Sequence, residues 1–79
     1  MLSSINPIKE VNMKKQELIT IMTELQQLQE KKVEISQRLV GIREQGDLSM
    51  NPEYQSAKEE EQRIYNRISE IETMLANIR

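Results

Sequence analysis

The chain is short, nearly neutral and poor in catalytic side chains. It has 79 residues, a net charge of −2, no Cys, no His and only two aromatic residues, both Tyr. This composition excludes a disulfide framework, the usual general base, the commonest metal ligands and a stacking platform for nucleic-acid bases. No apolar run is long enough to span a membrane, and the chain start has no signal-peptide core. We therefore expect a soluble, cytoplasmic helical protein that is not an enzyme on its own.

Cap and turn residues divide the chain into two helices. Both Pro residues follow an Asn, at Asn6-Pro7 and Asn51-Pro52, and Asn at the N-cap with Pro at the first helical position is a typical helix start. Gly46 suits the left-handed residue that ends a helix. The sequence therefore predicts a single domain, residues 1–79, in which a helix at about 7–45, a turn at 46–51 and a helix at about 52–79 form a hairpin.

Apolar residues recur in both helices at alternating spacings of three and four, the pattern of a left-handed coiled-coil seam. In the first helix the seam positions are Val11, Lys14, Leu18, Ile21, Leu25, Leu28, Lys32, Ile35, Leu39 and Ile42. In the second helix they are Tyr54, Ala57, Glu61, Ile64, Ile68, Ile71, Leu75 and Ile78. Folding at the turn pairs residue n with residue 96 − n, so that Leu39 faces Ala57. The predicted fold is all-α, a long antiparallel two-helix coiled-coil hairpin.

Packing between the two helices leaves two features of this pattern unexplained. Lys32 and Glu61 occupy adjacent seam layers with opposite charge, so we expect a cross-helix pair that fixes the register. The first helix also extends about ten residues past the second, and apolar residues continue there and on its outer face. They predict self-association, docking on another protein or a missing neighbouring domain, with residues 5–22 as the candidate contact surface and Val33 and Val40 widening the apolar stripe. These apolar residues are Ile8, Val11, Met13, Ile19, Met22, Val33 and Val40.

The turn, GDLSMN, lies at the end of an arm of roughly 55 Å, at about 1.5 Å per helical residue. Asp47 at its apex has an ordinary explanation as a turn residue, because Asp hydrogen-bonds nearby backbone N–H groups. Glu53 likewise complements the dipole of the second helix. The residues alone leave open whether the turn only reverses the chain or carries a carboxylate to a site on another protein.

The stretch from Lys31 to Arg79 resembles the N-terminal coiled-coil domain of the Gre transcript-cleavage factors, GreA and GreB, of bacterial RNA polymerase. The likeness is carried by REQGDL, then Asn51, Glu53-Tyr54 and Ala57-Lys58-Glu59, then Arg63-Ile64 and the heptads that follow. Loop and seam agree in order and spacing. The likeness covers nearly the whole chain and weakens before about residue 18.

The resemblance implies a regulator of transcription elongation whose hairpin enters the secondary channel of the polymerase. Asp47 would be a tip acid beside the catalytic Mg²⁺, where it helps the polymerase cut the 3′ end of backtracked RNA. That Mg²⁺ belongs to the polymerase, and no cofactor of the chain's own is implied. Arg43 and Lys58 match basic positions that steer the RNA end, with a solvated helix face as the ordinary alternative. The other tip and turn residues are Gly46, Leu48, Met50, Asn51, Glu53 and Tyr54.

This sequence departs from the family pattern in two places. The family typically has Glu as a second tip acid where this chain has Met50, and a thioether is a poor ligand for Mg²⁺. Family members also carry a C-terminal FKBP-like domain that docks on the polymerase, and this sequence stops where that domain would begin. We therefore expect transcript cleavage to be weak or defective. The alternatives are a module that recruits a partner in place of that domain, and a structural or oligomerising coiled coil without polymerase activity.

Overall fold

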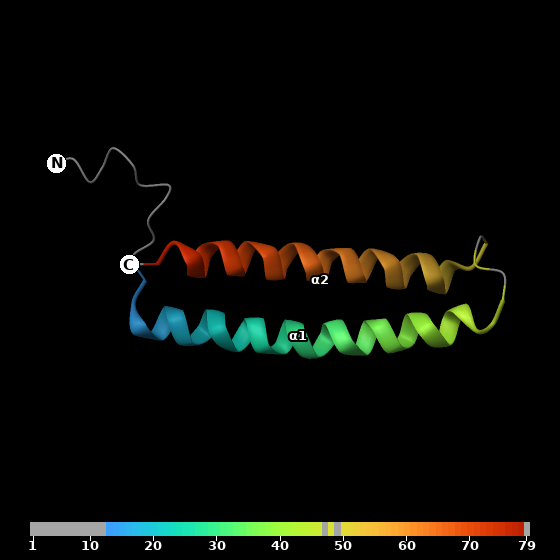
Figure 1. The fold of residues 1–79 in the computed structure, drawn as a ribbon, viewed down its shortest axis with the longest axis horizontal. Coiled ribbons are helices and arrows are strands. Elements are labelled where there is room, and N and C mark those ends of the chain that lie inside the picture. The colour runs from blue at the N-terminus through green and yellow to red at the C-terminus, as the bar shows by residue number, and fades with distance from the viewer. Residues whose placement is uncertain (1–12, 47, 49, 79) are drawn as a thin grey trace, which may run out of the picture.

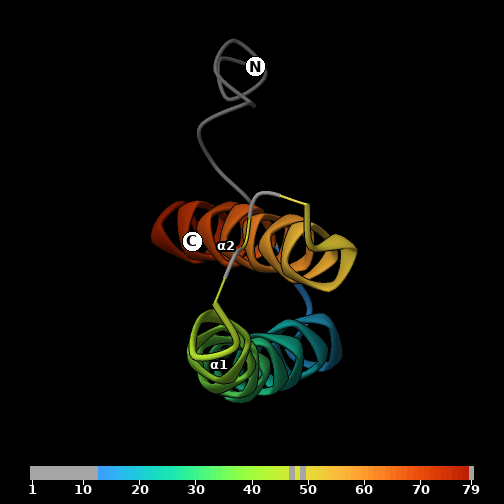
Figure 2. The same cartoon turned by 90° about the vertical axis from the view of Figure 1, so that its right-hand side faces the viewer.

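Two antiparallel helices form a rod-shaped hairpin. The computed structural model describes residues 13–46, 48 and 50–78, with α1 at Lys15–Arg43 and α2 at Pro52–Ala76. Figure 1 shows the start of α1 and the end of α2 at one end of the rod and the connecting turn at the other, and Figure 2 shows the two helices end-on. The body measures 60 by 23 by 14 Å. The predicted all-α helical hairpin is confirmed.

The first helix begins later than the sequence predicted. Met13 and Lys14 are not helical, and Lys14 has the extended backbone of an N-cap, with φ −71° and ψ 155°. The Glu17 carboxylate accepts a hydrogen bond from the Lys14 backbone N–H at 2.9 Å, which is half of a capping box. This local cap starts α1 at Lys15, so the helix does not run on from residue 7. The predicted start at Asn6-Pro7 lies outside the described residues.

The predicted overhang of α1 is correspondingly shorter. The last residue of α2 is Ala76 rather than a residue near 79, and in the predicted register it faces Thr20, only a little more than one turn into α1. Ile8 and Val11, two of the apolar residues assigned to the overhang, lie outside the described residues. Within the part of the chain that the structure describes, neither helix is both long and apolar enough to cross a membrane.

The core is a single layer of aliphatic side chains between the helices. Among the described residues, every buried hydrophobic side chain belongs to a predicted seam residue: Ile35, Leu39, Ile42, Ala57, Ile64, Ile68 and Ile71. Leu25, Leu28, Leu48 and Tyr54 are partly buried against this cluster. The buried residues of α1 all lie in its second half, and Leu48 and Tyr54 continue the packing beyond them. On α2 the buried residues run from Ala57 near the turn to Ile71, which is 0 % exposed, so the closed core extends from the turn to the middle of the rod.

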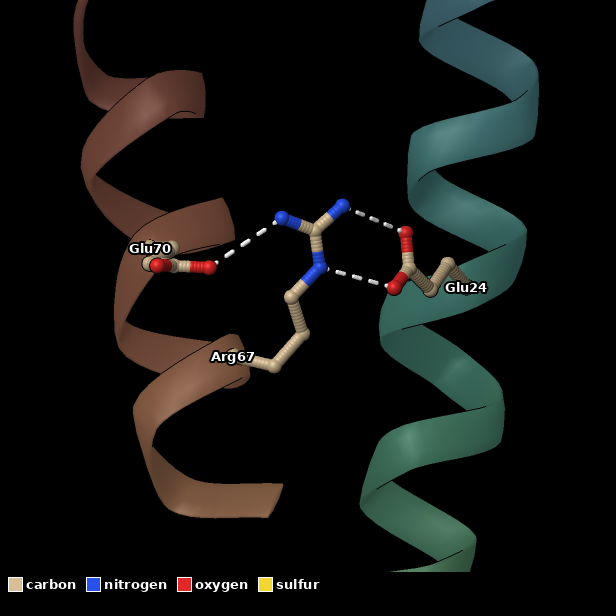
Figure 3. Close-up of polar contacts among 3 residues, drawn as sticks. All are labelled: Glu24, Arg67 and Glu70. Carbon is tan, nitrogen blue, oxygen red and sulfur yellow. Dashed lines mark hydrogen bonds and ion pairs between the residues drawn. The ribbon is translucent and has the colours of Figure 1, made fainter. Parts of the chain in front are cut away.

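An arginine bridges the helices near the middle of the rod. Arg67 makes a bidentate contact with the Glu24 carboxylate. Its Nε donates to Oε2 at 2.8 Å and its Nη2 donates to Oε1 at 2.9 Å. Its Nη1 also donates to Glu70 Oε1 at 3.2 Å (Figure 3). The hydrogen bonds from Arg67 lower the pKa of Glu24, and those to Glu24 and Glu70 raise the pKa of Arg67. Two parallel N–H···O bonds fix the orientation of both side chains, which a single contact does not.

A second cross-helix pair lies on the same flank, where Arg38 Nη1 contacts Glu60 Oε1 at 3.3 Å. Glu24, Arg38, Glu60 and Arg67 each come immediately before a seam residue, and we call this side of the hairpin the charged flank. Residues in this position face one another across an antiparallel seam, so both pairs agree with the predicted register.

The pair predicted inside the seam does not form. Glu61 accepts a hydrogen bond from Lys58 Nζ at 2.9 Å, and among the described residues its ion pair is with this neighbour rather than with Lys32. Lys58 and Glu61 are three residues apart on α2, so their side chains lie on the same helix face and meet within one helix. The register is therefore fixed by apolar packing and by the charged flank.

Candidate functional site at the hairpin tip

In the first half of the turn, the last helical turn of α1 narrows and the backbone then changes direction at Gly46. The backbone N–H groups of Gln45 and Gly46 bond the carbonyls of Ile42 and Arg43 at 3.0 and 3.2 Å, so the last turn closes with bonds three residues apart. Gly46 then takes a positive φ of 107°. A Cβ there would meet nothing within 4 Å, which means that the backbone angle, and not lack of space, favours glycine. This part of the prediction is confirmed.

The second half of the turn is held by the side chain of Asn51. Its Oδ1 accepts hydrogen bonds from the backbone N–H of Glu53 at 2.8 Å and of Tyr54 at 3.3 Å. Its own N–H donates to the Leu48 carbonyl at 3.2 Å. Pro52 is the first helical residue and has no N–H to satisfy. The Asn-Pro pair is therefore the N-cap that the sequence predicted.

Leu48 and Met50 of the described turn have opposite environments. Leu48 is half-buried and packs against the core cluster, so it anchors the turn to the rod. Met50 is 85 % exposed, more than any other large hydrophobic residue of the described chain. The Leu48 anchor and the Asn51 cap together fix the turn on both sides of Met50. The side chain at position 50 is thus presented to whatever the tip approaches.

The acidic residues described near the tip are Glu44 and Glu53. Both are exposed on either side of the turn, and no group of three potential ligands of the His, Cys, Asp or Glu type is found among the described residues. Asp47, the predicted tip acid, lies outside the described residues.

The two basic candidates lie close together beside the tip. Arg43 follows the seam residue Ile42, and Lys58 follows Ala57, so they face each other on the flank opposite the charged flank. The hydrogen bond to Glu61 raises the pKa of Lys58, and the nearby charge of Arg43 acts against that rise. The structure therefore brings these two residues together, with Lys58 already engaged by Glu61.

The sequence prediction missed the bridge formed by Glu24, Arg67 and Glu70. Its signal was present in the sequence, because residues of opposite charge precede seam residues on both helices. The prediction considered charges inside the seam and overlooked those along its edge.

Comparison with known proteins identifies the hairpin. The family model "Transcription elongation factor, N-terminal", GreA_GreB_N, matches residues 11–79. The chain is 53 % identical over 57 residues to transcription elongation factor GreA of Thermosipho africanus, a match that covers 71 % of this chain and 36 % of the relative. It is 42 % identical over 71 residues to GreA of Thermotoga neapolitana, covering 89 % of this chain and 46 % of the relative.

A similar match is found to GreA of Lachnoclostridium phytofermentans, at 51 % identity over 55 residues, covering 68 % of this chain and 34 % of the relative. The chain thus spans between a third and a half of the length of these relatives. No solved structure gives a significant match. With its capped antiparallel hairpin and a family match over nearly its whole length, the chain belongs to the GreA/GreB N-terminal domain family of transcription elongation factors.

Proposed function

We propose that this chain regulates transcription elongation in the cytoplasm by inserting its hairpin into the secondary channel of bacterial RNA polymerase. Its family membership supports the proposal, since the relatives are named transcription elongation factor GreA. The shape supports it as well. A rod 60 Å long carries its turn at one end and both outer helix ends at the other, so the turn can enter a channel while the rest stays outside.

The observation that carries the proposal furthest is the exposure of Met50 at the tip. At 85 % exposure, position 50 is open to a partner. A carboxylate there could bind a metal ion that the partner holds, whereas a thioether binds Mg²⁺ poorly. Asp47 remains as the single acid at a position that matches the tip acids of the family, since Glu44 and Glu53 lie outside those positions. We therefore propose that the chain occupies the channel and assists cleavage of backtracked RNA weakly or not at all. In this proposal Arg43 and Lys58 contact the extruded 3′ end of the RNA.

The alternative is a coiled-coil interaction module without polymerase activity. It is favoured by the exposed apolar residues of α1, among them Ile19, Met22 and Val33, each about half exposed. None of these residues belongs to the turn, so they favour a protein contact along the side of the rod.

The test is RNA cleavage in backtracked elongation complexes of a bacterial polymerase. The chain would be compared with its Met50→Glu variant, with Asp47→Ala as the matched loss-of-acid control, and each would be titrated against a complete GreA. We expect the chain to compete with GreA without strong cleavage, Met50→Glu to increase cleavage, and Asp47→Ala to remove what cleavage remains. If neither the chain nor Met50→Glu cleaves or competes, the proposal fails and the interaction module is favoured.

A further inference from the structure

Glu61 is a charged residue in an otherwise apolar part of the seam. In the predicted register it faces Ile35, which is 2 % exposed, and the Glu61 side chain is itself only 15 % exposed. An aliphatic residue at position 61 would bury apolar surface against Ile35 and so stabilise the hairpin. A carboxylate there lacks that packing and loses part of its hydration. This layer of the seam is therefore less stable than an all-apolar layer would be.

The ion pair of Glu61 does not offset this loss. Glu61 Oε1 accepts a hydrogen bond from Lys58 Nζ at 2.9 Å, and the Lys58 side chain is 43 % exposed. Pairs three residues apart on an exposed helix face contribute little to stability. The pair also stays within α2, so it does not select one register of the two helices over another. Neither stability nor register accounts for the carboxylate at position 61.

The contact holds Lys58 beside Arg43. The two basic residues face each other next to the turn, and the hydrogen bond to Glu61 raises the pKa of Lys58, whereas the positive charge of Arg43 acts to lower it. Two cations so placed repel each other, and a long Lys side chain can turn away through other rotamers. The hydrogen bond to Glu61 restricts these rotamers. Because an ammonium group has three N–H donors, Lys58 keeps donors for a ligand.

We propose that Glu61 is a positioning residue for this basic pair: it holds the Lys58 ammonium group beside the Arg43 guanidinium, so that the two cations together bind a phosphate group of single-stranded RNA. A guanidinium can donate two parallel hydrogen bonds to a phosphate, and an ammonium adds a compact charge. The inference rests on the proposed function, in which Arg43 and Lys58 contact the extruded 3′ end of the RNA. It adds a residue that does not touch the RNA itself.

The sign of one substitution separates positioning from a simple charge effect. If Glu61 contributes only its negative charge, Glu61→Gln should strengthen RNA binding, because a carboxylate repels phosphate. If Glu61 positions Lys58, the same variant should weaken binding, because Lys58 must then be ordered when the RNA binds. Glu60→Gln is the matched control. It removes the same charge one residue away, on the charged flank, where Glu60 contacts Arg38 at 3.3 Å.

The test is competition with a complete GreA for elongation complexes of a bacterial polymerase, prepared either backtracked or without extruded RNA. On backtracked complexes we expect Glu61→Gln to compete about threefold less well than the native chain, and Glu60→Gln to compete at least as well as the native chain. On complexes without extruded RNA the two variants should compete equally. Adding Glu61→Gln to Lys58→Ala should cause no further loss, since both changes remove the same contact.

Three outcomes overturn the proposal: undiminished competition by Glu61→Gln on backtracked complexes, an equal loss on both kinds of complex, or a further loss when Glu61→Gln is added to Lys58→Ala. A native chain that competes on neither kind of complex has a different meaning. It contradicts the proposed function, and the RNA-binding role of Glu61 fails with it.

The contact between Glu61 and Lys58 is tested on the chain alone. NMR of the Lys58 side-chain nitrogen during a pH titration reports the pKa of that group. We expect the pKa to be lower in Glu61→Gln than in the native chain and unchanged in Glu60→Gln. An unchanged pKa in Glu61→Gln would show that Glu61 does not hold Lys58.

Glu61→Leu separates positioning from a structural role. It completes the apolar seam, so it should raise the midpoint of urea unfolding and still compete as weakly as Glu61→Gln on backtracked complexes. Circular dichroism verifies that the variants stay helical. If Glu61→Leu competes as well as the native chain, or if it loses competition only because the hairpin is destabilised, Glu61 is not a positioning residue.

Discussion

Replacing Asn51 with Ala removes the side-chain oxygen that starts α2. That oxygen accepts from the backbone N–H groups of Glu53 and Tyr54 at 2.8 and 3.3 Å, and both donors lie in the first turn, where α2 has no carbonyl for them. Loss of an N-cap side chain costs about 0.5–2 kcal/mol. Because one bond here is short and the other long, we expect a loss of about 1 kcal/mol in the free energy of unfolding. For a domain of this size that lowers Tm by about 4–8 °C.

The assay is urea unfolding followed by circular dichroism, with native chain, Asn51→Ala and Asn51→Asp at one concentration. Asp keeps an acceptor in the same place and adds a negative charge at the positive end of the helix, so its stability should stay within about 0.5 kcal/mol of native. Equal losses for Ala and Asp would show that the amide acts in another way. No loss for Ala would show that the Leu48 anchor alone holds the turn.

Three further predictions concern the core, the Arg67 bridge and the turn glycine. Leu39→Ala should lower the free energy of unfolding by about 2–5 kcal/mol, because Leu39 is 1 % exposed. The neighbouring control Val40→Ala should lower it by well under half as much in the same urea assay. Similar losses for the two variants would contradict the assigned seam. The lowered pKa of Glu24 means that its bond to Arg67 stabilises the fold above pH 4.5 and that this contribution is lost as pH falls through the folded-state pKa. The stability difference between native and Glu24→Gln should therefore shrink on acidification, and a constant difference would refute the linkage. Gly46→Ala should cost about 1–2 kcal/mol from backbone angle alone, whereas an unchanged midpoint would mean that the turn relaxes freely.

Much of the fold could be predicted because each element carries its own local signal. The apolar spacing gave the seam, the Asn51-Pro52 pair gave the start of α2, and Gly46 gave the end of the rod. The start of α1 at Lys15 was not predicted, because its signal is weak: the Glu17 side chain bonds to the Lys14 backbone. The Asn6-Pro7 start lies outside the described residues and stays a prediction.

The candidate site could be predicted only in part. The environments of Leu48 and Met50 follow from the geometry of the closed turn. The two residues have similar hydrophobicity, so the sequence does not reveal which of them packs against the core. The pairing of Glu61 with Lys58 rather than Lys32 depends on rotamers, which spacing does not determine. The roles of Asp47, Arg43 and Lys58 depend on groups that another protein supplies, so they stay predictions.

The charged flank and the seam both repeat every seven residues, and this has a consequence for the reach of the rod. Removing or adding seven residues in each helix would move the turn by about 10 Å along the axis and return every side chain nearly to its original face. A number far from a whole number of helical turns would rotate the turn and misalign the contact of Arg67 with Glu24. Insertion or deletion of whole heptads in both helices thus changes the length of the hairpin in steps of about 10 Å and keeps the orientation of the turn.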